Sequence, residues 1–483
     1  MIVYTRLPEE TRHVYHYARW DGAAWRDHEI VAAGRWFPRT PPGQKEREPH
    51  YSGGIALAPD DPSVVWLSRP VNGVFEIERW RTPDLGAHWE HEPVTAGSRA
   101  DNVRPVAVRG APGQVLWMHL DRGYEHYTRF GCSIRMNRPE PPALPAVLDP
   151  AAVRAAMERV GRWQLEHSSA HPPLDWTQGT LHAGLLALGR LSEDARFERA
   201  VLEAGRAHGW KAGPRPLHAD DLCVTQAWLE LSLRHRDPAM RAPARAALEA
   251  LAAGPLEPLE WRKSVHLRQW AWCDALFMAP PALALLHAAT GEAHFLDELD
   301  RRWWRTVDFL LDPDERLLFR DSRSRAAREP NGAKVFWSRG NGWVLAGLAR
   351  LLPHLPAGRR ARYEQLFVAM AERVAALQRE DGSWSAGLLD REAWPAPETS
   401  GTGFFCFALA WGVNGGLLPR ERFAPRIERA WAALVRAVDS NGMLQWVQPI
   451  GSGPRAVRAA DTDVFGTGAF LLAGEQVHRL ASR

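Results

Sequence analysis

The sequence lacks a strong net charge, a cysteine framework and long hydrophobic segments. Its 60 basic and 57 acidic residues leave a formal charge of +3, so nothing indicates binding to nucleic acid or to an acidic membrane surface. The four cysteines are scattered, without CxxC or Cys/His spacing. We therefore predict no disulfide framework, no metal site and no cofactor. No apolar run is long enough to span a bilayer.

The N-terminus also lacks the features of a secretory signal peptide. The opening MIVYTRLPEETRHVYHY has neither a basic first segment nor a following apolar segment. On this chain alone we predict a cytoplasmic protein, and a periplasmic or secreted one if the natural chain begins further upstream. Lysine is scarce as well: only residues 45, 211, 263 and 334 are lysines among the 60 basic residues. A GC-rich genome explains that scarcity as well as any function does.

Tryptophan, by contrast, is abundant, with 23 residues against 7 tyrosines. Indole rings pack well on the apolar faces of sugars, but they also fill hydrophobic cores, so the number is compatible with both uses. At 483 residues the chain is longer than one ordinary core requires. This length predicts two or three domains, or one large toroid.

Residues 1–137 have the pattern of β-structure, with short alternating runs such as SVVWLSRPV separated by turn residues. Within them, TPDLGAHW at 82–89 fits the Asp-box pattern S/T-x-D-x-G-x-x-W and resembles the BNR repeats of β-propellers. We expect Asp84 to accept backbone N–H groups, Gly86 to supply an unusual φ, and Trp89 to fill the space below the blade. A blade takes roughly 45 residues and propellers close with about four to eight blades. The segment is therefore incomplete as a propeller.

A proline-rich hinge is predicted at 138–150, because its prolines oppose regular structure. From 151 to 483 the periodicity predicts twelve amphipathic helices. Twelve helices joined by short loops are the content of an (α/α)6 barrel, in which six inner and six outer helices alternate. The predicted helices are 151–167, 177–190, 193–208, 221–236, 239–253, 273–289, 293–311, 341–353, 359–379, 401–416, 420–437 and 464–480.

Polar, glycine and aromatic residues gather just before every second helix. In an (α/α)6 barrel the even-numbered helices run in one direction, so their N-terminal ends meet on one rim. Six helix N-termini also direct partial positive charge to that rim, which favours an anionic ligand. The segments before the even-numbered helices are DWTQGTLHAG (175–184), HADD (218–221), WAWCDALFM (270–278), WSRGNGW (337–343), ETSGTGFF (398–405) and DTDVFGTGAF (461–470).

Acidic residues on this rim are the candidates for catalysis. Asp274 stands in an otherwise apolar helix start, where poor solvation raises the pKa of a carboxyl group as a general acid requires. A helix N-cap is the alternative role. Asp220 and Asp221 precede the fourth helix, and we expect one of them to cap it and the other to be the second carboxylate of the site. His218 and His266 are near these acids and are further candidates for contact with a substrate.

Arg339 lies between Trp337 and Trp343 in WSRGNGW. Its guanidinium would add a permanent charge and a planar fork that matches a carboxylate, with the two indoles stacking on a ring beside it. The alternative is a pair of core tryptophans and a solvent-exposed arginine. Glu398, which is followed by Thr399 and Ser400, is interpreted first as a helix cap.

Together these motifs resemble glycoside hydrolase family 105, the unsaturated rhamnogalacturonyl hydrolases, which are close to the unsaturated glucuronyl hydrolases of family 88. The resemblance runs from about residue 150 to 483. It implies an (α/α)6 barrel that removes a 4,5-unsaturated uronic acid from lyase-generated oligosaccharides by hydrating the C4=C5 bond. The segments that carry it are HADDLCVTQAWLEL, WAWCDALFMAPPALALLHAATGE, KVFWSRGNGWVLAGLARLL, DGSWSAGLLD, ETSGTGFFCFALAWGVNGGLL and TDVFGTGAFLLAGEQV.

The resemblance also implies roles for single residues. Asp274 matches the acid that protonates C4 and then helps water to add at C5. Asp220 matches the second aspartate of the family, or Asp221 does if the register slips by one. The other residues implied to bind substrate are Trp176, Trp337, Arg339 and Trp343, with His218 and His266 as weaker candidates.

The chain departs from the family in two places. Many members have a histidine upstream of the W-x-R motif, where this chain reads LLFRDSRSR (317–325), so Arg320, Asp321 or Arg323 is expected in its place. The stretch before the catalytic aspartate reads WRKSVHLRQW, in which His266 is only a partial match. Both changes affect the part of the site that reads the sugar.

Other functions were weighed against this one. N-acylsugar 2-epimerases share the toroid but need catalytic histidines on the rim. A non-catalytic glycan-binding protein would not need Asp274 in its apolar setting. A lyase site in the β segment would need more blades than this segment can form. The expected partner is an oligosaccharide with an unsaturated uronic acid at its non-reducing end. Pectic rhamnogalacturonan is the default source, followed by ulvan-type or arabinogalactan-type glucuronides. No oligomeric state is predicted.

Overall fold

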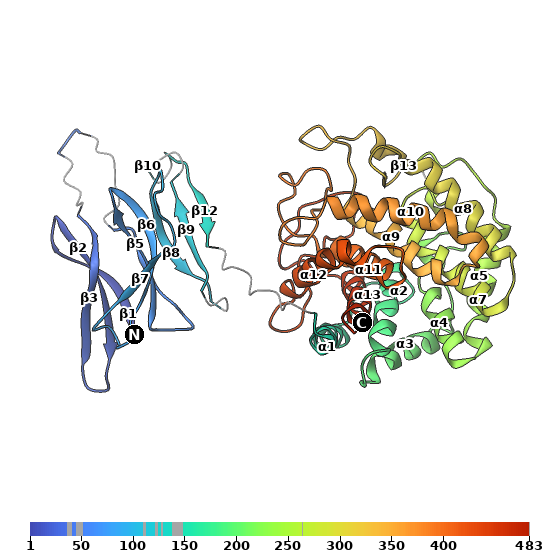
Figure 1. Cartoon of the computed structure of the whole chain (residues 1–483), viewed down its shortest axis with the longest axis horizontal. Coiled ribbons are helices and arrows are strands. Elements are labelled where there is room, and N and C mark those ends of the chain that lie inside the picture. The colour runs from blue at the N-terminus through green and yellow to red at the C-terminus, as the bar shows by residue number, and fades with distance from the viewer. Residues whose placement is uncertain are drawn as a thin grey trace. The chain divides into compact units, whose positions relative to one another are not determined.

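The chain consists of two compact units, Met1–Leu144 and Pro145–Arg483, in a computed structural model (Figure 1). The structure describes residues 1–35, 41–44, 52–109, 113–120, 124–126, 129–137, 148–262 and 264–482. Most of the hinge predicted at 138–150 lies outside the described residues. Its last three residues are described, and there Asp149 caps the first helix by accepting the N–H of Ala151 at 3.1 Å.

The N-terminal unit is built from small antiparallel sheets. Their strand orders are β1-β2-β3, β4-β5-β6-β7, β12-β9-β8 and β10-β11. The strands are β1 (Ile2–Glu9), β2 (Arg12–Trp20), β3 (Trp25–Gly34), β4 (Ile55–Leu57), β5 (Val64–Val71), β6 (Val74–Arg81), β7 (Glu90–Pro93), β8 (Asn102–Ala107), β9 (Val115–His119), β10 (Tyr124–His126), β11 (Arg129–Phe130) and β12 (Ser133–Met136).

The segment TPDLGAHW forms the turn between β6 and β7. Asp84 accepts the backbone N–H of His88 at 2.7 Å, and Gly86 has a φ of +110°, which a residue with a side chain adopts only under strain. Trp89 donates its indole N–H to the Gly86 carbonyl at 3.1 Å. The same ring stands edge-on to Tyr17 of β2, with 5.4 Å between ring centroids, and so ties this turn to a neighbouring sheet.

The C-terminal unit contains the twelve helices predicted from the sequence, one of them interrupted at Ala279. In the described residues they are α1 (Pro150–Glu166), α2 (Trp176–Gly189), α3 (Arg196–Ala207), α4 (Thr225–His235), α5 (Ala242–Ala253), α6 and α7 (Ala275–Met278 and Pro280–Thr290), α8 (His294–Leu310), α9 (Ser338–Leu351), α10 (Ala357–Ala376), α11 (Thr399–Asn414), α12 (Arg420–Arg436) and α13 (Val464–Ala481). A short hairpin, β13 (Leu311–Asp312) with β14 (Leu317–Leu318), follows α8.

Alternate helices close into an inner ring (Figure 1). In order around the ring, α2 contacts α4, α4 contacts α7, α7 contacts α9, α9 contacts α11, α11 contacts α13, and α13 returns to α2. The inner helices are buried nearly all round, whereas an outer helix such as α3 buries only Phe197, Val201 and Gly205. A helix apolar on every side belongs inside a domain, and one with a single apolar stripe belongs on its surface.

Glycine allows a close approach between two helices of this ring, α2 and α13. A Cβ atom on Gly468 of α13 would lie 2.3 Å from the carbonyl oxygen of Thr180 in α2, which no side chain can tolerate. The Gly-Thr-Gly of the last predicted rim segment therefore serves helix packing.

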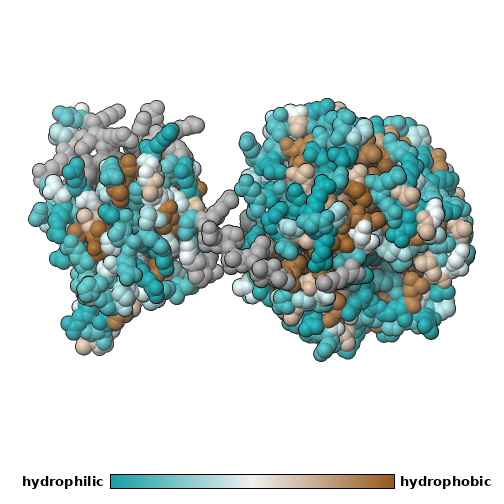
Figure 2. All heavy atoms as spheres, in the orientation of Figure 1, coloured by the Kyte–Doolittle hydropathy of each residue, from teal (hydrophilic) through white to brown (hydrophobic). Residues whose placement is uncertain are grey.

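None of the described helices is long and apolar enough to cross a membrane. On the face of the helical unit seen in Figure 2, hydrophobic residues occur in groups among hydrophilic ones.

Candidate active site

Two carboxylates approach each other at the N-terminal ends of inner helices. Asp274 directly precedes α6, and Asp220 opens a short 3-10 turn, η1 (Asp220–Leu222), which packs against α6. The side chains of Asp220 and Asp274 are 20% and 12% exposed, so both reach solvent from a largely buried position.

Asp274 occupies the N-cap position of α6, but its side chain makes no capping hydrogen bond. The capping role considered from the sequence is therefore wrong. Its carboxylate instead accepts a hydrogen bond from the Cys273 thiol, with 3.3 Å between Sγ and Oδ2. Burial raises the pKa of Asp274, and the charge of Arg320, whose Nε lies 3.8 Å from Oδ2, opposes that rise. A carboxyl group that keeps its proton near neutral pH can act as a general acid.

Burial and the nearby Asp274 charge raise the pKa of Asp220 to about 8. Two carboxyl groups that repel each other in a poorly solvated position retain one proton between them, as in other catalytic carboxylate pairs. The site therefore holds an acidic proton at neutral pH, beside a second oxygen group able to accept one.

Asp221 is turned away from this pair. It is buried and paired with Arg215, with 2.6 Å between Nη2 and Oδ1, and it also accepts the backbone N–H of Arg215. The structure thus gives Asp221 a structural partner and leaves Asp220 beside Asp274. The expectation that one of the two caps the fourth helix is wrong, because Val224 occupies the N-cap of α4 and no side chain caps it.

His218 and His266 lie beside the pair as neutral rings. His218 Nδ1 accepts the backbone N–H of Asp220 at 3.2 Å, and burial lowers the pKa of His218 to about 3. The His218 ring packs against Trp272 with centroids 5.4 Å apart. His266, in the 3-10 turn η3 (Val265–Leu267), stacks on Trp261 at 5.0 Å, and its pKa is lowered by burial and then by the charge of Arg320.

The structure contradicts the interpretation of Arg339 as a solvent-exposed arginine, since its side chain is buried. It is buried between the rings of Trp337 and Phe465, at 4.5 and 4.7 Å from the ring centroids. Its terminal nitrogens donate to the carbonyl oxygens of Gln448 and, at 3.0 Å, Pro449. Arg339 therefore joins α9 to the loop before α13.

Trp337 and Trp343 are also buried, and the expected stacking of both indoles on a sugar is not what the structure shows. Trp337 faces Arg339 and donates its N–H to Gln448 Oε1 at 3.0 Å. Trp343 packs against Phe277 and Phe404. Trp337 directly precedes α9 and Trp343 lies within it, and both indoles are directed into the protein.

Trp176 is the half-buried aromatic residue of this set. It is the first residue of α2 and stands edge-on to Trp343, at 5.7 Å between centroids. Trp343 thus supports a ring that itself remains partly accessible.

The two tryptophans give a matched pair of variants. We expect Trp176→Ala to raise KM about tenfold at nearly unchanged thermal stability, because one aromatic contact with a sugar is lost. Trp343→Ala should instead destabilise the fold by about 3–5 kcal/mol, as loss of a buried aromatic ring does. Steady-state kinetics and thermal unfolding of both variants check this. Equal losses of stability with an unchanged KM would place Trp176 in the core.

Gln448 is a residue of the site that sequence reasoning missed. Its side chain accepts from Trp337, and its backbone N–H donates to Glu398 at 3.2 Å. Glu398 is the cap of α11, accepting the N–H groups of Ser400 and Gly401 at 3.0 and 2.7 Å, in agreement with its first interpretation. No local pattern marks Gln448, because the two partners that tie it to the rim segments, Trp337 and Glu398, lie 50 or more positions away in the sequence.

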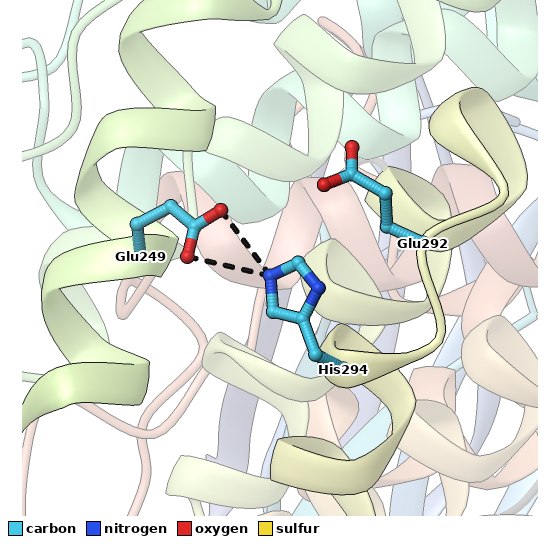
Figure 3. Close-up of side chains that lie close together, drawn as sticks. All are labelled: Glu249, Glu292 and His294. Atoms are coloured by element: carbon cyan, nitrogen blue, oxygen red, sulfur yellow. Dashed lines mark hydrogen bonds and ion pairs between the residues drawn. The ribbon is translucent and has the colours of Figure 1, made fainter.

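Metal-ligating side chains gather elsewhere in the described residues. Glu249, Glu292 and His294 lie near one another at α5 and the start of α8, with His294 directed at the Glu249 carboxylate (Figure 3). Arg245 already binds Glu292 through two hydrogen bonds, at 2.5 and 2.6 Å. In the structure these residues form an ion-pair network between the outer helices α5 and α8.

A cavity of about 340 Å³ lies at the opposite, C-terminal ends of the inner helices. Ion pairs already engage its charged groups, since Arg190 binds both Glu230 and Glu475.

A barrel of alternating helices with an acidic pair and aromatic rings on one rim defines an (α/α)6 carbohydrate-active enzyme. Comparison with known proteins identifies the family. The sequence profile described as Glycosyl Hydrolase Family 88 matches residues 151–481. The chain therefore belongs to glycosyl hydrolase family 88, and the prediction that it is a glycosidase is confirmed. Family 105, named from the motifs, is its near relative.

Individual relatives agree with this assignment. The unsaturated 3S-rhamnoglycuronyl hydrolase of Formosa agariphila is 38% identical over 350 residues, which are 69% of this chain and 92% of that protein. A protein of the same name from Alteromonas sp. is 36% identical over 317 residues, 62% of this chain and 77% of that one. The solved structure of a glycosyl hydrolase family 88 protein from Bacteroides vulgatus has a TM-score of 0.62 at 28% identity, covering 69% and 99% of the two chains.

Proposed function

We propose that this protein removes a terminal 4,5-unsaturated uronic acid from oligosaccharides produced by polysaccharide lyases. The observation that carries the proposal is the Asp220–Asp274 pair at the N-terminal ends of inner helices of a family 88 barrel, where burial raises the pKa of both carboxyl groups. The activity named for relatives that are 36–38% identical supports it. The C4=C5 double bond of such a sugar is a vinyl ether, which reacts with acid and water.

In the proposed reaction Asp274 donates its proton to C4, and the electrons of the C4=C5 bond form the new C–H bond. The positive charge left at C5 is shared with the ring oxygen. Water then adds to C5 and returns a proton to the Asp274 carboxylate. The resulting hemiketal opens to a ketone at C5, and the remainder of the oligosaccharide leaves from C1. This route needs a single proton donor rather than the two-carboxylate displacement of ordinary glycosidases.

Asp220 is proposed to assist from beside Asp274. When water adds at C5 and returns a proton, the neighbouring Asp220 carboxylate is able to share that proton with Asp274. His218, neutral and bonded to the Asp220 backbone, keeps the 3-10 turn in place. An epimerase would need a histidine that exchanges protons near neutral pH, and the lowered pKa values of His218 and His266 disfavour that role.

For the sugar next to the uronate we propose rhamnose with a sulfate on O3. Both relatives act, by their names, on 3S-rhamnoglycuronyl compounds. The proposed source of the substrate is therefore a sulfated ulvan-type glucuronide rather than pectic rhamnogalacturonan, which was the default source inferred from the sequence.

The test follows the ultraviolet absorbance of the conjugated unsaturated uronate with a panel of lyase-generated disaccharides. We expect absorbance to fall with wild type, fastest for the rhamnose 3-sulfate compound and at least tenfold slower without the sulfate. A faster desulfated substrate would overturn the sulfate preference. A flat signal over the whole panel with folded protein would overturn the activity and favour a non-catalytic glycan-binding role.

For the N-terminal unit we propose a BNR-type Asp-box hairpin. The Asp84–His88 hydrogen bond, the positive φ of Gly86 and the packing of Trp89 support it. Within the described residues one sheet, β4-β5-β6-β7, has the four strands of a propeller blade.

A further inference from the structure

Arg320 is held beside the catalytic acid by the backbone of two neighbouring segments. Its carbonyl accepts the N–H of Cys273 at 2.9 Å, and Asp321 forms a β-bridge with Trp272. These contacts fix the Arg320 segment, which follows β14, in register with the residues before Asp274. The guanidinium lies over the Trp261 ring at 4.8 Å and is 14% exposed.

The Nη1 atom of the Arg320 guanidinium is hydrogen-bonded to Asp321, whereas its Nε atom faces Asp274. Nη1 donates to Asp321 Oδ2 at 2.7 Å. Nε lies 3.8 Å from Asp274 Oδ2, beyond hydrogen-bond reach, and is buried without a hydrogen-bond partner. The edge formed by Nε and Nη2 is one that binds a carboxylate side-on through two parallel hydrogen bonds.

The substrate brings a carboxylate to this place. Its carboxyl group is attached to C5, the carbon next to the C4 atom that Asp274 protonates, so it must bind close to Asp274. Within the described residues, Arg320 is the cation found within 4 Å of the Asp274 carboxylate. Arg339, the other cation whose charge acts on Asp274, donates its terminal nitrogens to backbone carbonyl oxygens.

We propose that Arg320 binds the C5 carboxylate of the unsaturated uronate and thereby couples substrate binding to protonation of Asp274. This inference rests on the proposed function. In the free protein the charge of Arg320 favours the ionised form of Asp274. A bound carboxylate neutralises Arg320 and adds a negative charge beside Asp274, and both changes favour the protonated acid. Binding of the uronate thus favours the protonated form of Asp274, which is the form that donates the proton to C4.

The charges around Asp274 are compatible with this coupling. Arg320 and Arg339 lower its pKa, and the Cys273 thiol donates to its carboxylate. Asp220 faces it from η1 and disfavours a second negative charge. Asp321 remains paired with Arg320 and Arg323, so the Arg320 side chain stays anchored while its Nε edge takes the carboxylate.

The experiment compares the uronate disaccharide with its methyl ester, which has no negative charge. Wild type should prefer the acid by on the order of 100-fold in kcat/KM, the value of one charge-assisted bidentate pair. Arg320→Gln should lose that preference by slowing on the acid alone, and Arg320→Lys should restore it in part. Arg323→Gln is the matched control, since Arg323 also binds Asp321 and stacks on Trp261 but is 54% exposed.

Proton uptake tests the coupling separately. Calorimetric titration with a saturated uronoside, in buffers of different ionisation enthalpy at pH 7, should show proton uptake for wild type and none for Arg320→Gln. If folded Arg320→Gln keeps the acid-over-ester preference, or takes up protons as wild type does, the inference is overturned while the proposed function stands. If wild type hydrates no member of the panel, the proposed function itself fails.

Discussion

Asp274→Asn is expected to lower kcat by about 10³-fold or more on every substrate that wild type accepts. Asparagine has nearly the size and shape of the carboxyl group but cannot deliver a proton, and a positioned general acid contributes roughly 10²–10⁴-fold. Absorbance at the unsaturated bond measures the loss, and KM should change little.

The control for this variant is Asp194→Asn. Asp194 lies just before the outer helix α3 and forms a partly exposed ion pair with Arg196. The Asp194→Asn variant should retain wild-type activity. Retention of more than a tenth of the activity by Asp274→Asn would show that Asp274 does not supply the proton to C4, and Asp220 would then be the first alternative.

Asp220→Asn should make the protein more stable at alkaline pH and less active at any pH. The pKa of Asp220 rises from an ordinary 3.8 to about 8 on folding, so between those values the folded state binds a proton that the unfolded chain has lost. Stability therefore falls as the pH rises through this window. Asparagine does not ionise, so the Asp220→Asn variant does not lose stability in this way as the pH rises.

We expect wild type and Asp220→Asn to unfold at similar temperatures near pH 4. At pH 8 the variant should be more stable by ~2 kcal/mol, which corresponds to a rise in unfolding temperature of about 3 °C for a domain of this size. Thermal unfolding followed by circular dichroism across pH 4–8.5 measures the difference. Parallel curves for the two proteins would contradict the raised pKa.

The neighbouring Asp221 provides the opposite control. Asp221→Asn breaks the buried ion pair with Arg215, and it should lower the unfolding temperature rather than raise it.

Activity of Asp220→Asn should fall by about 100-fold, since the carboxylate pair can no longer share a proton. For wild type, kcat should decline as the pH rises above about 8, where the pair loses its remaining proton.

The helices and their order could be predicted because the information for them is local. Apolar residues recur with the helical period in each segment, and the alternation of all-round apolar helices with amphipathic ones distinguishes inner from outer positions. The rim followed from topology alone, since alternate helices of such a barrel run in one direction. The family resemblance and the enzyme class rested on the same segments.

The orientation of individual side chains was not predictable in this way. Two adjacent aspartates, Asp220 and Asp221, read alike in the sequence, yet one faces Asp274 and the other is bound to Arg215. Trp337 and Trp343 were expected to meet a sugar, and both are buried against partners from other segments, Gln448 for Trp337 and Phe277 and Phe404 for Trp343. In each case the outcome depends on which partner the three-dimensional fold places within a few ångströms.

The sequence by itself thus determined a twelve-helix barrel, the rim that carries its polar clusters, and Asp274 as a carboxyl group in apolar surroundings. Only the tertiary structure decided that Arg339 is an internal brace between Trp337 and Phe465, and that Arg320 stands 3.8 Å from the catalytic acid. The physical reason is range. Periodicity and capping act within a few residues of one another, whereas burial, ion pairing and pKa depend on groups that the chain brings together from distant positions.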